Sequence, residues 1–296
     1  MGAADVVPGV SGGTVAFITG IYEELIDSLK SIDLDALRLL SSFRIVDFWN
    51  KINGSFLIAL LGGVATSLIS LAKLMTYLLT NHAVLIWSFF FGLILVSAPL
   101  IMREITKWNL GSVLSFIAGI IISYLITILS PAETPTNYPF IFFCGALAIC
   151  AMILPGISGA FILLLIGKYE YMIKALIDIN IPVILTFISG CLVGLLGFSR
   201  FLSWILKHYR FPTLALLAGF MIGALNKVWP WKQVISFRLD HEGMQVPAFD
   251  KSILPWNYFT ATGQDPQVFK AILCAAVGIL LVIAIEKIAA MLKTKS

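Results

Sequence analysis

Apolar runs separated by short polar segments dominate the chain. Six of them reach or approach the roughly 20 residues that a helix needs to cross about 30 Å of hydrocarbon. They cover residues 55–80, 83–102, 111–130, 182–206, 211–229 and 268–291. With 59% hydrophobic and only 12% charged residues, the composition also excludes an ordinary soluble domain, in which about 25% of residues are charged. We therefore predict an all-α integral membrane protein.

Two short glycine-rich stretches inside this apolar sequence are copies of each other. Residues 7–13 read VPGVSGG and residues 154–160 read LPGISGA, a spacing of 147 residues. Further pairs follow at spacings of 147, 127 and 159 residues: Gly20 with Gly167, Tyr22 with Tyr169, Lys73 with Arg200, and Gly119 with Gly278. We therefore predict an internal duplication, with a first repeat at residues 1–137 and a second at residues 138–296.

Each motif interrupts a helix. Proline removes a backbone donor, and glycine lowers helix propensity, so the break leaves polar backbone groups that lipid cannot satisfy. We predict a re-entrant helical hairpin in each repeat, with arms at Tyr138–Leu154 and Ile157–Ile177 in the second and a short or missing leading half-helix in the first. A hairpin adds no net crossing and three transmembrane helices add an odd number, so the duplication is expected to have inverted topology.

Two segments have no counterpart in the other repeat, and they account for the changes in spacing. Residues 31–50 combine leucines at helical spacing with mixed charges, which predicts an interfacial helix. Residues 230–266 are polar and contain four prolines. We expect this second insertion to be extracytoplasmic.

Lysine and arginine are unevenly distributed over the two predicted sides. Eleven of the 20 fall on one side: Lys30, Arg38, Arg44, Lys51, Arg103, Lys107, Lys207, Arg210, Lys287, Lys293 and Lys295. By the positive-inside rule, the short basic loops and the C-terminus are expected in the cytoplasm.

The glycine-rich turns are candidate anion sites. A turn that opens a half-helix presents free N–H groups, an arrangement that holds phosphate or carboxylate oxygens. Ser11, Thr14 and Ser158 could add hydroxyl donors beside Gly13. The alternative is close helix packing, since Gly9 and Gly13 also form a small-x-x-x-small pair.

Ionisable residues inside the membrane are the second group of candidates. Lys73 and Arg200 share a repeat position within predicted spans, where a cation is costly unless it has a partner. They could bind an anionic substrate or extend to the headgroups. Glu23 and Glu170 could couple transport to protons or anchor the helices at the interface, and Asp5 is a further candidate without a counterpart.

No metal or cofactor is expected. The four cysteines, Cys144, Cys150, Cys191 and Cys274, lie in apolar segments without Cys-x-x-Cys spacing. We interpret them as small buried hydrophobic residues. The expected partners are the bilayer and a lipid substrate, with no nucleic acid.

Residues 2–14 (GAADVVPGVSGGT), followed by GIYEELI at residues 20–26, resemble the signature of a bacterial polyprenyl-phosphate (undecaprenyl-phosphate) transporter family. The resemblance implies a flippase-type protein of the plasma membrane that recycles the lipid carrier for cell-envelope synthesis. It also implies a head-group site at the paired motifs, at positions Pro8, Gly9, Ser11, Gly12, Pro155, Gly156, Ser158 and Gly159. The second copy differs from the first in having Ala160 and Phe161 in place of Gly13 and Thr14.

Two other functions are compatible with the residues. A small-anion secondary transporter could have the same architecture. A polyprenyl-pyrophosphate phosphatase would need an arginine beside the serine and clustered glutamates, whereas Gly12 and Gly159 follow the serines here. We therefore expect a transporter and not an enzyme.

Overall fold

The structure is a computed structural model, and it describes residues 1–2, 11–129, 134–239 and 245–293. Pro8, Gly9, Asp5 and the leading half-helix of the first repeat lie outside the described residues. The side chain of Lys73, within helix α6, also lies outside them.

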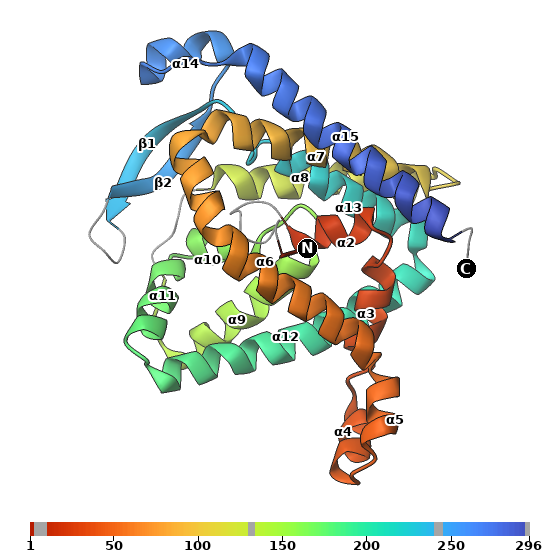
Figure 1. The fold of residues 1–296 in the computed structure, drawn as a ribbon. Coiled ribbons are helices and arrows are strands. Elements are labelled where there is room, and N and C mark those ends of the chain that lie inside the picture. The colour runs from red at the N-terminus through yellow and green to blue at the C-terminus, as the bar shows by residue number, and fades with distance from the viewer. Residues whose placement is uncertain (3–10, 130–133, 240–244, 294–296) are drawn as a thin grey trace.

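The described chain is mainly helical, with one two-stranded sheet (Figure 1). The helices are α2 (Gly12–Ile18), α3 (Tyr22–Lys30), α4 (Leu34–Ser41), α5 (Ile45–Lys51), α6 (Gly54–Asn81), α7 (Ala83–Arg103), α8 (Leu110–Ile128), α9 (Tyr138–Ile153), α10 (Gly159–Leu165), α11 (Tyr169–Ile177), α12 (Ile181–His208), α13 (Arg210–Ala224), α14 (Pro255–Thr262) and α15 (Val268–Lys293). Strands β1 (Lys232–Leu239) and β2 (Gln245–Ser252) pair antiparallel. Within the described residues, α7, α8, α12 and α15 are long and apolar enough to span a membrane. The prediction of a helical membrane protein is confirmed.

Helices in the two halves begin and end at matching positions. Helices α2 and α3 have the same lengths as α10 and α11, 7 and 9 residues, and both pairs start 147 residues apart. Helices α6 and α12 each have 28 residues and start 127 residues apart. The spacings found in the sequence therefore recur as spacings between elements of equal length.

Glycines let the long helices pack at backbone contact. In α7, a Cβ on Gly92 would lie 2.1 Å from the carbonyl oxygen of Ala275 in α15. In α13, a Cβ on Gly219 would lie 2.3 Å from the carbonyl oxygen of Phe116 in α8. Helix α13 also contacts α7, so α7, α8, α13 and α15 form one layer, seen at the top of Figure 1. Helices α9 and α12 pack together in the other part of the molecule.

Helix α13 is shorter than predicted. The apolar run at 211–229 suggested a spanning helix, but the helix has only 15 residues, about 22 Å of rise. Leu214, Ala215 and Met221 in it are fully buried by protein. The run is apolar because α13 lies in the core of the bundle, and not because lipid surrounds it.

The second arm of the predicted hairpin is also interrupted. Residues 157–177 form α10 and α11 instead of one half-helix, and the break falls at Gly167, which has a φ of 65°. Gly20 has a φ of 72° at the matching break between α2 and α3. Positive φ strains any residue with a Cβ, so these paired glycines mark turns.

The two insertions have structures that differ from the simple prediction. Residues 31–50 form two helices, α4 and α5, which meet at Phe43 with a φ of 55°. This helical pair projects away from the bundle (Figure 1). The insertion at 230–266 contains β1, β2 and α14.

Candidate functional site

The two glycine-rich motifs meet inside the protein. The Ser11 hydroxyl donates to the carbonyl oxygen of Leu154 at 3.0 Å, with that of Met152 at 3.3 Å, and accepts from the Gly13 N–H at 3.1 Å. Ser11 is 1% exposed. One serine thus caps the start of α2 and holds the end of α9, although 141 residues separate Ser11 from Met152.

Thr14 and Gly13 complete this contact. The Thr14 hydroxyl accepts from the Gly156 N–H at 3.1 Å, and a Cβ on Gly13 would lie 2.5 Å from the carbonyl oxygen of Ile153. The buried Tyr22 hydroxyl donates to the same Ile153 oxygen at 3.2 Å. Polar groups of the first copy therefore satisfy the backbone that the second copy leaves unpaired.

Replacing Thr14 tests the importance of this hydrogen bond. Thr14→Val keeps the shape of the side chain but removes the acceptor, which leaves the buried Gly156 N–H unsatisfied. We expect a loss of about 1–3 kcal/mol in stability, measured by thermal unfolding in detergent. Thr14→Ser retains the hydroxyl and should lose less; equal losses would contradict the assigned role of the oxygen.

Ser158 has a different environment from its counterpart Ser11. No hydrogen bond of its hydroxyl is found within the described residues, and it lines a crevice with Thr127, Phe161 and Lys227. The crevice measures about 10 Å³, close to the space of one water molecule. The Lys227 ammonium lies 4.4 Å from the centre of the Phe161 ring. Phe161 replaces the threonine of the first copy and supports a cation in this position.

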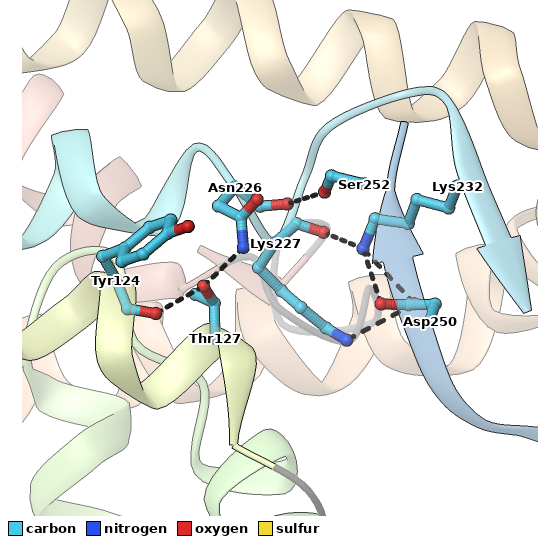
Figure 2. Close-up of polar contacts among 7 residues, drawn as sticks. All are labelled: Tyr124, Thr127, Asn226, Lys227, Lys232, Asp250 and Ser252. Atoms are coloured by element: carbon cyan, nitrogen blue, oxygen red, sulfur yellow. Dashed lines mark hydrogen bonds and ion pairs between the residues drawn. The ribbon is translucent and has the colours of Figure 1, made fainter. Parts of the chain in front are cut away.

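A larger cavity of about 370 Å³ adjoins this crevice, and Thr127 and Lys227 line both. Figure 2 shows that Lys227 and Lys232 both approach the carboxylate of Asp250. The Lys232 ammonium lies 3.3 Å from Asp250 and donates to the carbonyl oxygen of Lys227 at 2.6 Å. Burial and the nearby Lys227 ammonium lower the pKa of Lys232 to about 8, although Asp250 opposes the shift.

The remaining predicted residues lie elsewhere in the fold. Arg200 donates to the carbonyl oxygens of Leu196 and Ile32, each at 2.7 Å. Glu23 pairs with Arg210 at 2.6 Å, and Arg210 also binds Glu104. Among the described residues, Arg200 contacts neither motif serine, and its role in binding an anion stays a prediction.

Glu170 lies in α11. Its role in coupling, like that of Glu23, stays a prediction.

Sequence reasoning did not single out Lys227 and Lys232. Lys227 falls within the apolar run 211–229 that was assigned to a spanning helix. A cation inside such a run is the signal that could have identified it. Lys232 and Asp250 could not be paired from the sequence, because the register of β1 and β2 brings them together.

Fold and site together define a helical membrane protein whose interrupted helices place polar groups between its two halves. The chain belongs to the undecaprenyl phosphate translocase-like family, whose sequence model matches residues 1–246. It is 47% identical over 289 residues to a polyprenyl-phosphate transporter of Vibrio cholerae. The aligned region covers 98% of this chain and 94% of that protein. A polyprenyl-phosphate transporter of Staphylococcus aureus is 34% identical over 248 residues, 78% of this chain and 83% of that protein. No solved structure matches the chain.

Proposed function

We propose that this protein moves polyprenyl phosphate, the undecaprenyl form in particular, across the bacterial plasma membrane. The names of its relatives support this substrate. The structural observation that carries the proposal is the Ser158 crevice. There a hydroxyl with no hydrogen-bond partner in the described chain and the Lys227 ammonium line one space beside the crossing of the two motifs. A phosphate monoester carries about 1.5–2 negative charges and three acceptor oxygens, which suit such donors.

The transport site lies in an inverted duplication with two re-entrant hairpins. Helices of equal length at constant spacing support the duplication. The packing supports the duplication further. Gly92 contacts Ala275 in α15, and Gly219 contacts Phe116 in α8. The two glycines are separated by the spacing of 127 residues and their two partners by the spacing of 159, so the contacts occupy matching positions. Inverted repeats that meet at interrupted helices are a common architecture of secondary transporters.

The two motif copies have different roles in this proposal. Ser11 and Thr14 hold the crossing together, because their hydroxyl groups bind the chain at Leu154 and Gly156, and Gly12 and Gly13 lie between them at the start of α2. Ser158, at the start of the Gly159 helix, faces the phosphate. Pro155 ends the preceding arm, and the first-copy Pro8 and Gly9 are expected to do the same.

The cytoplasmic side is the end of the bundle that carries α3, α4, α5 and the last turn of α15. Figure 1 places these elements opposite β1, β2 and α11. The excess of lysine and arginine at the first end supports this orientation under the positive-inside rule. The β-hairpin insertion then lies on the extracytoplasmic side.

Reconstitution of the purified protein into vesicles with labelled polyprenyl phosphate tests the proposal. We expect protein-dependent exchange of the lipid between leaflets and no release of phosphate. Ser158→Ala should slow exchange by about 2–10-fold, the equivalent of one hydrogen bond of about 0.5–1.5 kcal/mol. Exchange at the rate of protein-free vesicles would refute transport, and phosphate release from a polyprenyl pyrophosphate would favour the phosphatase. Competition by a soluble phosphate as strong as that by the lipid would favour a small-anion transporter.

A further inference from the structure

The cavity around Asp250 carries more positive than negative charge. Lys227, Lys232 and Lys251 line it together with one carboxylate, so the net charge is 3 − 1 = +2 when all four groups are ionised. The Lys227 and Lys232 side chains are only 18% and 11% exposed. Cations held this far from water need a counter-charge, and within the described residues both lysines pair with Asp250.

Hydrogen bonding differs between the two ammonium groups, each of which has three N–H donors. The Lys232 ammonium already donates to the Lys227 carbonyl oxygen and to both carboxylate oxygens of Asp250. Lys227 lies 3.6 Å from Asp250, longer than a good hydrogen bond, and it also lies over the Phe161 ring. Hydroxyl and amide groups on the same wall are already tied together, since Asn226 donates to Thr127 at 2.7 Å (Figure 2). The wall is therefore ordered, and the Lys227 ammonium that lines the cavity keeps donors that a ligand can use.

The size of the two spaces indicates an order of events. The outer cavity of about 370 Å³ is within the range of ligand pockets, whereas the crevice at Ser158 has room for about one water molecule. A phosphate group fits the first but cannot enter the second unless α8 and the segment around Ser158 move apart. Since Lys227 lines both spaces, it can contact the phosphate before and after this movement.

We propose that Lys227 and Lys232 form a receiving site for a phosphate monoester head group, in which Asp250 is an internal counter-ion that the phosphate displaces. The ligand identity rests on the proposed function, but the site itself rests on the charges and the cavity. Asp250 lies on β2 of the insertion, and Lys232 lies on β1, where it pairs with Ser252, two residues from Asp250. The β-hairpin thereby supplies both a ligand for the phosphate and the group that competes with it.

Binding of farnesyl monophosphate to the detergent-solubilised protein, measured by calorimetry, tests the proposal. Lys227→Gln and Lys232→Gln should each weaken binding at least 10-fold, whereas Asp250→Asn should tighten it several-fold, because it removes the competitor. Lys270→Gln is the matched control: the same charge is lost from an exposed position in α15, and binding should change less than two-fold. A gain of affinity in Asp250→Asn cannot result from misfolding, so the test remains decisive even if one lysine variant unfolds.

Unchanged binding in both lysine variants, or weaker binding in Asp250→Asn, would overturn the proposal. Farnesol, which lacks the phosphate, should not bind. Inorganic phosphate should bind more weakly than farnesyl monophosphate, and equal affinities would overturn the lipid head group as the ligand.

Vesicle exchange assays on the same variants separate the receiving-site hypothesis from the transport hypothesis. If the wild type exchanges lipid while the lysine variants bind normally, only the receiving site is refuted. If the wild type exchanges none while the variants behave as expected, only transport is refuted.

The receiving site should also respond to pH. Three groups face Lys232: Asp250 on β2, Lys227 in the segment after α13, and the Trp87 ring of α7. Lys251 and Tyr124 line the same cavity. Because the pKa of Lys232 is about 8, Lys232 loses its proton between pH 7 and 9. A phosphate monoester, whose second pKa is near 6, stays doubly charged over this range. Affinity should therefore fall over this range in the wild type and much less in Lys232→Gln; equal pH profiles would contradict the role of Lys232.

Discussion

Gly13→Ala is expected to abolish most of the transport activity. The new Cβ would lie 2.5 Å from the carbonyl oxygen of Ile153, so the two motifs would have to separate. The neighbouring bonds from Ser11 to Leu154 and from Gly156 to Thr14 would lengthen with them. Overpacking of this kind costs about 1–3 kcal/mol. Since 1.4 kcal/mol is a factor of ten in an equilibrium, we expect exchange to fall by about 10-fold or more, together with a lower unfolding temperature.

Gly62→Ala provides the matched control for this change. Gly62 lies in α6, and a Cβ there would meet no atom within 4 Å. Alanine also has a higher helix propensity than glycine, by about 1 kcal/mol. Vesicle exchange and thermal unfolding of Gly62→Ala should therefore match or exceed the wild type. Similar losses in both variants would show that the crossing of the motifs does not depend on the missing side chain of Gly13.

Gly156→Ala is expected to have the second large effect. Gly156 has a φ of 84°, which costs a residue with a Cβ about 1–2 kcal/mol. The Cβ would also lie 3.0 Å from backbone atoms of Phe220 and Met221 in α13. Strain and crowding together should lower stability by about 2–5 kcal/mol, and exchange should fall strongly because Gly156 lines the crevice with Ser158.

Gly263→Ala separates strain from crowding. Gly263 has a similar φ of 71°, but a Cβ there would meet no atom within 4 Å. Its loss in thermal unfolding should therefore reflect strain alone, about 1–2 kcal/mol, with normal lipid exchange. A Gly156→Ala variant no less stable than Gly263→Ala would mean that α13 does not restrict the motif.

The hydrophobic pattern predicted most of the helices because it is a local property of the chain. Long apolar runs indicated the helices, whereas the duplication suggested by the pairing of residue 7 onward with residue 154 onward stays a prediction. The helix breaks at Gly20 and Gly167 could also have been predicted, since both glycines were already matched in the sequence. The length of α13 could not, because an apolar residue such as Leu214 is equally suited to lipid and to a protein core.

The candidate site was predictable only in part. The proline and glycine residues identified the two motifs in the sequence. The different hydrogen bonding of Ser11 and Ser158 depends on long-range contacts, which the sequence does not reveal. Arg200 was a candidate anion ligand because a cation in a span needs a partner, and the structure adds two backbone carbonyl partners, including that of Ile32, while the anion role stays a prediction. The Lys227, Lys232 and Asp250 cluster depends on strand register and on the end of α13, neither of which the sequence pattern specifies.

The last helix of each half, α8 and α15, packs on the other half, and this arrangement constrains how the protein can move. Helix α8 of the first half packs on α13 of the second, and α15 of the second half packs on α7 of the first. Pulling the two halves apart would break the backbone contacts at Gly92 and Gly219 simultaneously. A conformational cycle can more easily shift the four-helix layer as one rigid body against α9, α12 and the short helices that they carry. The hinges of such a cycle would then lie in the connections between layers, and not at the boundary between the sequence repeats.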